Sequence, residues 1–281
     1  MSYSLHALYR AVGISKQAVH QYEQRQQVFD RNVQALIVEV DDLRRDHPGC
    51  GVEKMYYTLR PDFIGRDRFV ELMMQLGYRI KRKKNYRRTT FSASVYYPNF
   101  IQGMELDAPS MVWQSDITYF AVGECFFYGV FITDVYNRRI VGHQVSDHMR
   151  ATANIKALQM ALNVQPAPAI HHSDRGSQYI YRHYVDLLQK LGVRISMGQT
   201  AQDNAYAERV HRTIKEEYID HWKPKNLPEL RQMVTKAVDH YNHTRPHNSL
   251  GKVSPEAFTE QWKELPPEQR RKLIIFDNLF S

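Results

Sequence analysis

The sequence predicts an α/β fold preceded by an all-helical region. Three runs of strand-forming residues follow one another closely after residue 111, and strand and helix patterns then alternate up to about residue 218. The first 80 residues instead place apolar side chains at helical spacing. A length of 281 residues is consistent with roughly two domains.

The predicted strands form a three-stranded meander. They span Val112–Phe120, Cys125–Thr133 and Arg139–Val145, with turns at Gly123-Glu124 and Asn137-Arg138. Short turns of this kind join antiparallel neighbours, so we expect all three strands in one sheet.

Helices and strands alternate after the meander. The pattern predicts, in order, a helix at Thr152–Leu162, a strand at Ala169–Ser173, a helix at Ser177–Leu191, a strand at Val193–Met197 and a helix from Asp203 to about Tyr218. This order matches the ribonuclease-H topology, a five-stranded mixed sheet with flanking helices. Element order alone also fits several other folds.

The amino-terminal region predicts two helical modules, at residues 1–26 and 32–80. In the first, Gly13 separates two short helices and Ser15 is placed to cap the second, as in a helix-turn-helix. In that motif Lys16, Gln17 and His20 would face the major groove of DNA. A helical hairpin with an apolar inner face explains the pattern equally well.

Basic residues are concentrated in the first third of the chain. The 38 Lys and Arg residues against 30 Asp and Glu give a net charge of +8, and residues 1–98 hold 17 of the basic and 10 of the acidic ones. Such asymmetry favours a polyanionic partner, most often nucleic acid. A linker at 81–107 begins with six cationic side chains expected to contact phosphate, or to act as a solvated tether: Lys81, Arg82, Lys83, Lys84, Arg87 and Arg88.

Composition excludes several classes of protein. An apolar fraction of 43% and a charged fraction of 24% are ordinary for a globular protein and exclude disorder, collagen and coiled coil. The longest apolar run, Cys125–Ile132, is far shorter than the roughly 20 residues that cross a bilayer. Two cysteines cannot form a disulfide framework, which favours a reducing, cytoplasmic location without a membrane partner.

Three carboxylates fall where this topology can bring them together. Asp116 lies in the first strand of the meander, Asp174 follows the fourth strand, and Glu208 lies in the last predicted helix. Two divalent ions held by carboxylates are well suited to phosphodiester chemistry. Each acid also has a structural explanation: a cap for Asp116, a turn for Asp174, and an ion pair with Arg212 for Glu208.

Other polar residues are weaker candidates or surround the acids. Asp134, Asp203 and Glu216 are explained by a turn, a helix cap and solvation. Glu208, His211, Arg212 and Lys215 share one helical face, and Arg212 and Lys215 are predicted to contact the DNA backbone. The residues alone leave the roles of His172, Arg245 and His247 open.

Several segments resemble one known family. They are HPGCGVEKMYYTLR (47–60), WQSDITYF (113–120), HHSDRGSQY (171–179), DNAYAERVHRTIKEEY (203–218), YNHTRPHNSLG (241–251) and SPEAF (254–258). In this order they resemble the OrfB-type transposases of bacterial insertion sequences, which have a retroviral-integrase-like DDE core. The resemblance implies a catalytic core at 108–222 and a helical extension at 223–281.

The resemblance also implies a chemistry. Asp116, Asp174 and Glu208 would bind two Mg²⁺ ions, with Mn²⁺ as a substitute, and catalyse DNA cleavage at element ends and strand transfer into target DNA. A homo-oligomer on DNA, an upstream-frame partner protein and association with the nucleoid are further expectations. One departure is that 33 residues separate Asp174 and Glu208, two fewer than is usual in the family, and the deletion falls in the loop at 198–202.

Two other functions remain compatible with the sequence. A domesticated DNA-binding regulator would use the helix-turn-helix and perform no chemistry. A metal-dependent nuclease would cleave DNA without strand transfer. An intact set of three acids argues against the regulator, whereas only an assay separates the nuclease from a transposase.

Overall fold

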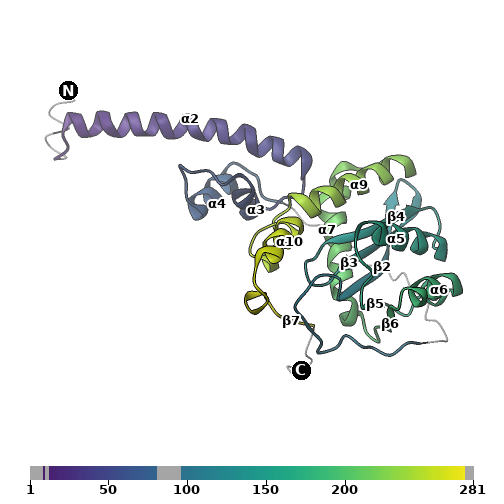
Figure 1. The fold of residues 1–281 in the computed structure, drawn as a ribbon. Helices are drawn as coiled ribbons and strands as arrows, with labels where there is room; N and C mark the ends of the chain where they lie inside the picture. The colour runs from purple at the N-terminus through teal and green to yellow at the C-terminus, as the bar shows by residue number, and fades with distance from the viewer. Residues whose placement is uncertain (1–8, 10–12, 81–95, 276–281) are drawn as a thin grey trace. The chain divides into compact units, whose positions relative to one another are not determined.

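The computed structural model describes residue 9, residues 13–80 and residues 96–275. The chain divides into two compact units. The helical unit comprises Met1–Asp46 and Gly51–Arg79, and the sheet unit comprises His47–Cys50 and Ile80–Ser281. Figure 1 shows the elements of each unit. None of the helices in the described ranges is both long and apolar enough to span a membrane.

The helical unit contains the helices α2 (Lys16–Asp46), α3 (Val52–Leu59) and α4 (Arg66–Gln75). Its apolar side chains form a small core: Leu36, Val40, Met55, Phe69 and Met73 are all buried. The Tyr78 hydroxyl donates to Asp41 on α2 at 2.6 Å, which fastens the segment after α4 to that helix.

The boundary predicted between the two helical modules is wrong, because α2 runs without interruption through residues 27–31. No glycine or proline occurs between Gly13 and Pro48, so nothing in the backbone ends the helix there. The predicted start is confirmed: Gly13 has a φ of +72°, and Ala18 donates its N–H to the Ser15 hydroxyl at 3.1 Å. The helix before Gly13 lies largely outside the described residues.

The sheet unit is built on five strands in the order β4-β3-β2-β5-β6. Their bounds are β2 (Val112–Val122), β3 (Cys125–Asp134), β4 (Ile140–Ser146), β5 (Ile170–Ser173) and β6 (Arg194–Met197). The first three pair antiparallel as predicted, β5 pairs parallel to β2, and β6 pairs parallel to β5. The mixed sheet with this strand order confirms the predicted ribonuclease-H-like fold class.

Helices cover both faces of the sheet. The helices α5 (Ala151–Val164) and α6 (Arg182–Lys190) pack with Trp113 and Ile132 on one face. The helices α7 (Ala205–Ile214) and α9 (Leu227–His243) pack with Phe120 and Phe131 on the other. Short elements complete the unit: β1 (Glu105–Leu106), three 3₁₀ turns at Ser177–Ile180, Ala201–Asn204 and Asn248–Leu250, a π-helical segment (Lys215–Ile219), α8 (Asp220–Trp222), α10 (Pro255–Glu264), a 3₁₀ turn (Pro267–Gln269) and β7 (Leu273–Ile274).

The predicted boundaries at 107 and 223 do not separate independent parts. Ile101 and Leu106, assigned to the linker, are buried in a cluster with Ile275, and β1 pairs with β7. Residues 80–281 likewise belong to one compact unit. The linker was predicted to extend to residue 107 because of the basic run at its start. Its end is wrong, since the apolar residues after Pro98 belong to the core. Residues 81–95 lie outside the described part.

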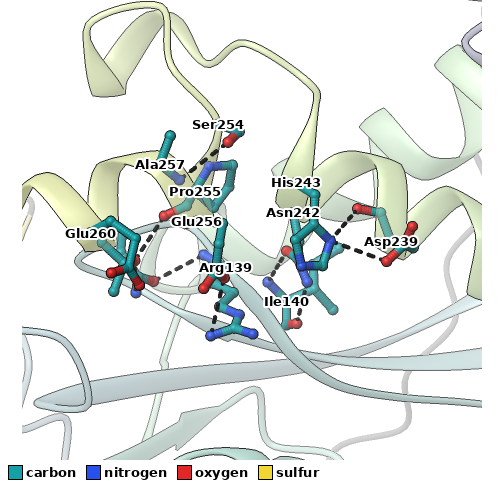
Figure 2. Close-up of polar contacts among 12 residues, drawn as sticks. Arg139, Ile140, Asp239, Asn242, His243, Ser254, Pro255, Glu256, Ala257 and Glu260 are labelled. Atoms are coloured by element: carbon teal, nitrogen blue, oxygen red, sulfur yellow. Dashed lines mark hydrogen bonds and ion pairs between the residues drawn. The ribbon is translucent and has the colours of Figure 1, made fainter.

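The carboxy-terminal extension is fastened to the outer edge of β4 (Figure 2). The Asn242 side chain on α9 accepts from the N–H of Ile140 at 3.0 Å and donates to the Ile140 carbonyl at 2.9 Å. Arg139 pairs with Glu256 on α10 at 3.2 Å, and Ser254 caps α10 by accepting from Ala257 at 3.2 Å. The extension therefore completes the sheet unit.

A buried polar cluster centres on Glu217 in the π-helical segment. Arg245 donates to both carboxylate oxygens of Glu217 at 2.7 Å, and His47 donates from Nε2 to one of them at 2.7 Å. The N–H of Gly49 donates to the Glu217 carbonyl at 2.7 Å. The His47–Cys50 segment thus belongs to the sheet unit through contacts with a residue distant in sequence.

Candidate active site

Asp116 lies in the middle of β2, opposite Phe131 on β3. Its side chain is 15% exposed. The Oδ1 atom accepts from the N–H of Ile117 at 2.8 Å, and the Oδ2 atom lies 3.4 Å from Nδ1 of His211 on α7. The carboxylate is therefore partly buried between the central strand and the helix that carries Glu208.

The strand pairing brings Asp174 close to Asp116. In the parallel register of β2 and β5, Ser115 pairs with Ser173, so the next residues, Asp116 and Asp174, follow at the same level of the sheet. Gly176 donates its N–H to Oδ1 of Asp174 at 3.0 Å, which fixes the turn after β5. The predicted turn role of Asp174 is thus compatible with a site role.

Glu208 is placed by hydrogen bonds between β2 and the start of α7. The Gln114 amide donates to the Asp203 carbonyl at 2.9 Å and accepts from the N–H of Ala207 at 3.4 Å. The Asn204 amide donates to the Ser115 carbonyl at 3.1 Å. Because Gln114 and Ser115 directly precede Asp116, the helix start is held against the strand that bears the first acid.

The three acids influence one another electrostatically. The pKa of Asp116 is raised well above its usual value by burial and by the negative charges of Asp174 and Glu208, against a lowering by the Ile117 N–H and Lys215. Burial also raises the pKa of Glu208, whereas Arg212 acts to lower it. Negative charge concentrated at one place favours protons or cations there.

The donor chemistry of these acids fits a hard divalent cation such as Mg²⁺, which prefers carboxylate oxygens. Within residues 13–80 and 96–275, however, no group of three or more His, Cys, Asp or Glu side chains is arranged to hold a metal ion. The charges of Asp174 and Glu208 therefore act on Asp116, but the three side chains do not surround a single point as metal ligands would.

Two of the weaker acidic candidates, Asp203 and Asp134, form local contacts of the kind predicted for them. The Asp203 carboxylate accepts from the N–H groups of Gln199 and Thr200 at 2.8 and 2.9 Å and forms a capping box with Thr200. Burial acts to raise the pKa of Asp203, but these hydrogen bonds lower it overall. Asp134 accepts from the N–H groups of Ser110 and Tyr136 at 2.6 and 2.9 Å and so holds the turn after β3.

The residues whose roles the sequence left open are buried and hydrogen-bonded within the described part of the chain. His172 is buried, and its Nδ1 forms a hydrogen bond of 2.9 Å with the Ser196 hydroxyl on β6. Arg245 is buried against Glu217 and also contacts Nε2 of His247 at 3.0 Å. Arg245 and His247 therefore pack inside the sheet unit.

The polar face predicted on α7 divides into different environments. Arg212 is exposed, and Lys215 is half-buried with its Nζ 4.3 Å from the centre of the Tyr119 ring. Burial lowers the pKa of Lys215 to about 8. His211 is buried and contacts Asp116. The sequence placed His211 on this face, but no residue pattern indicated that its side chain would point to the acid.

The predicted DNA-reading residues lie in the helical unit. Lys16, Gln17 and His20 are exposed in the first turns of α2, where His20 shares a hydrogen bond of 3.1 Å with Gln24. Their exposure leaves them accessible to a ligand. The six cations of the basic run lie outside the described residues.

Comparisons with known proteins identify the family. Models of the integrase core domain match residues 107–202 and 191–255. A 31 kDa protein of insertion element IS600 from Shigella sonnei is 37% identical over 72% of this chain and 77% of its own length. The transposase for insertion sequence element IS629 from Shigella sonnei is 32% identical over 75% and 73%.

A solved structure is similar to part of this chain. The catalytic core domain of HTLV-2 integrase in complex with magnesium matches with a TM-score of 0.47 and 16% identity, over 54% of this chain and 97% of that one. The family models together span residues 107–255, and the two sequence relatives cover 72% and 75% of this chain. The chain therefore belongs to the insertion-sequence transposases with an integrase core domain, and it is a DNA transposase of the polynucleotidyl transferase class.

Proposed function

We propose that Asp116, Asp174 and Glu208 are the catalytic acids of this transposase, acting in cleavage at the ends of an insertion sequence and in strand transfer into target DNA. The electrostatic coupling of Asp116 to both other acids, within an integrase core, is the observation that supports this assignment. The hydrogen bonds from Gln114 and Asn204 support the inclusion of Glu208 despite the shortened loop.

We propose that the same three acids hold two Mg²⁺ ions and that Mn²⁺ can replace Mg²⁺. Such ions would supply Lewis-acid activation of the attacking oxygen and charge stabilisation at the leaving oxygen. The protein's contribution is to keep the acids on rigid elements: Asp116 in the central strand, Asp174 at the adjacent strand end, and Glu208 on a helix fastened to that strand.

DNA is the proposed partner along three surfaces. Arg212 and Lys215 would meet the phosphate backbone beside the acids. Lys16, Gln17 and His20 would contact bases, and the basic run at 81–88 would contact phosphates. We further propose that the protein acts on DNA as a homo-oligomer. A separately encoded upstream-frame protein would join this complex, and the complex would act at the bacterial nucleoid.

The decisive experiment uses the full chain, Mg²⁺ and DNA carrying the ends that flank its own gene. Asp116→Asn, Asp174→Asn and Glu208→Gln each remove a charged oxygen and preserve volume. Cleavage and strand transfer should fall by several orders of magnitude in all three, and a double substitution should cost little more than a single one. Binding to end DNA without metal should survive, because phosphate contacts come mainly from basic residues.

Particular results would overturn parts of this assignment. Near-normal strand transfer by Glu208→Gln beside two inactive aspartate variants would remove Glu208 from the site. Cleavage by the wild-type protein without joining of the cut ends to a second DNA would indicate a nuclease. Specific binding with no metal-dependent cleavage would indicate a regulator.

A further inference from the structure

His211 lies on α7 one turn after Glu208 and faces into the sheet unit. Only 7% of its surface is exposed. Its Nδ1 lies 3.4 Å from Oδ2 of Asp116, and the ring also interacts with the Asp116 backbone. On its other side the ring packs against Phe131, with ring centroids 5.5 Å apart. A single side chain thus touches both the first acid and the apolar layer beneath the helix.

The surroundings of this imidazole are unusual for a purely apolar packing role. Its Nε2 atom is buried and has no hydrogen-bond partner among the described residues. Burying a polar atom without a partner is unfavourable, and an aliphatic side chain of similar volume would fill the same space without that cost. The contact with Asp116 is the polar interaction that distinguishes histidine from leucine at this position.

The two oxygens of Asp116 are engaged from different elements. The N–H of Ile117, in the same strand, donates to Oδ1 at 2.8 Å. His211, in the helix, approaches Oδ2. An aspartate held only by its own strand could still rotate about its side-chain bonds, whereas a second contact from α7 restricts that rotation. Groups that hydrogen-bond to metal-binding carboxylates, without binding the metal themselves, affect metal affinity and activity.

We propose that His211 is a positioning residue: its imidazole, whose Nδ1 lies 3.4 Å from Oδ2 of Asp116, holds the Asp116 carboxylate in the orientation needed for metal binding and couples it to the helix that carries Glu208. The inference rests on the proposed function of Asp116 and Glu208. It assigns His211 no contact with DNA or with the reacting atoms.

The chain offers a matched control in His143 on β4. Its ring also lies near Phe131, with centroids 6.4 Å apart and the rings nearly parallel. Its Nε2 lies 3.3 Å from the Thr235 hydroxyl. Among the described residues, its ring has no hydrogen bond or ion pair with any of the three acids. Leucine at either histidine therefore disturbs the packing around Phe131, but only His211→Leu removes a contact with Asp116.

The experiment measures metal binding separately from catalysis. The melting temperature of the full chain is recorded against MgCl₂ concentration without DNA, because a ligand of the folded state, at free concentration c, stabilises it by RT ln(1 + c/Kd), and the curve therefore yields the dissociation constant for Mg²⁺. End cleavage is then titrated with MgCl₂. His211→Leu should raise the dissociation constant from the first titration and the half-saturating concentration of the second about 10- to 100-fold. His143→Leu should leave both unchanged.

A conservative variant distinguishes positioning from packing. His211→Asn places an amide N–H near the position of Nδ1 and should stay within about threefold of wild type. His211→Gln places its amide farther out, near the position of Nε2, and should behave like the leucine variant. If His211→Leu does not fold, the comparison of Asn with Gln decides the question.

The outcomes also separate this inference from the proposed function. Unchanged metal titrations in His211→Leu, or equal defects in the asparagine and glutamine variants, would overturn the positioning role while leaving the acids intact. If wild type itself shows no Mg²⁺ stabilisation beyond that of Asp116→Asn, and no Mg²⁺-dependent cleavage, the proposed function fails instead.

Discussion

Buried histidines make individual residues sensitive to acid. His171 is 1% exposed, and its Nε2 shares a hydrogen bond of 2.9 Å with the Tyr184 hydroxyl. Burial lowers its pKa from 6.5 to about 3, with a further lowering by His172. Between these two values the unfolded chain binds a proton that the folded chain does not. The stability that His171 contributes is therefore fully present above pH 6.5 and is lost as the pH falls toward 3.

This predicts a pH-dependent difference between wild type and His171→Gln. Glutamine keeps a polar group toward Tyr184 but cannot titrate. From pH 7 to pH 5, the free energy of unfolding of wild type should fall relative to the variant by about 2 kcal/mol. Urea denaturation of both proteins at several pH values measures it. A difference that stays constant with pH would mean that His171 is not held neutral by the fold.

At the residue scale, the sequence predicted the three acids and left the contacts of several neighbouring residues open. Asp116, Asp174 and Glu208 were predicted because carboxylates at three places in one topology point to a common chemistry. The roles of Asn242 and Arg245 were not predictable, because their partners Ile140 and Glu217 lie 102 and 28 residues away. The burial of such a polar residue cannot be predicted from its neighbours in sequence, because it depends on a partner that only the fold brings close.

Among the elements, a close backbone approach joins the segment at Gly49 to the π-helical segment. A Cβ atom on Gly49 would lie 2.2 Å from the Cα of Glu217, which is closer than any real contact. Nothing lies within 4 Å of a Cβ placed on Gly51, two residues further on. The two glycines therefore form a natural pair for comparing a close approach with open space.

We expect Gly49→Ala to lower the free energy of unfolding by about 3 kcal/mol or more, because the clash is with backbone that cannot rotate away. Gly51→Ala, at the start of α3, should change it by less than about 1 kcal/mol. Chemical denaturation of the two variants measures both values. Equal stabilities would show that the segment at 47–50 does not rest on Glu217 in solution.

Elements with regular patterns were predicted closely, and irregular ones were not. The strands β2, β3 and β4 begin or end within two residues of their predicted positions, since β-branched and aromatic residues between turns specify them. The π-helical segment at Lys215–Ile219 has no sequence signature, and the helix was predicted to continue regularly. The long α2 was divided wrongly at residues 27–31, where no helix-breaking residue occurs.

For the whole molecule, the uneven charge predicts how DNA binding depends on salt. If the six cations at 81–88 contact phosphates, each contact adds roughly 0.9 to the slope of log affinity against log salt concentration. Replacing all six with serine should flatten the slope by up to about 5 and change sequence preference little. Fluorescence anisotropy with end DNA and scrambled DNA at several salt concentrations measures both. An unchanged slope would leave the run as a solvated tether.

The two outer strands of the sheet have further consequences for assembly. Beside β4, Asn242 occupies both backbone groups of Ile140, and Arg231 donates to the Val145 carbonyl at 2.9 Å. Beside β6, Met197 donates its N–H to the Pro98 carbonyl at 3.3 Å. Exposed strand edges are templates for pairing with other chains, and side chains or loops that occupy them prevent it. If copies of this transposase gather on DNA, as proposed above, these contacts keep them from joining their sheets edge to edge, the route that leads to aggregates instead of an ordered complex.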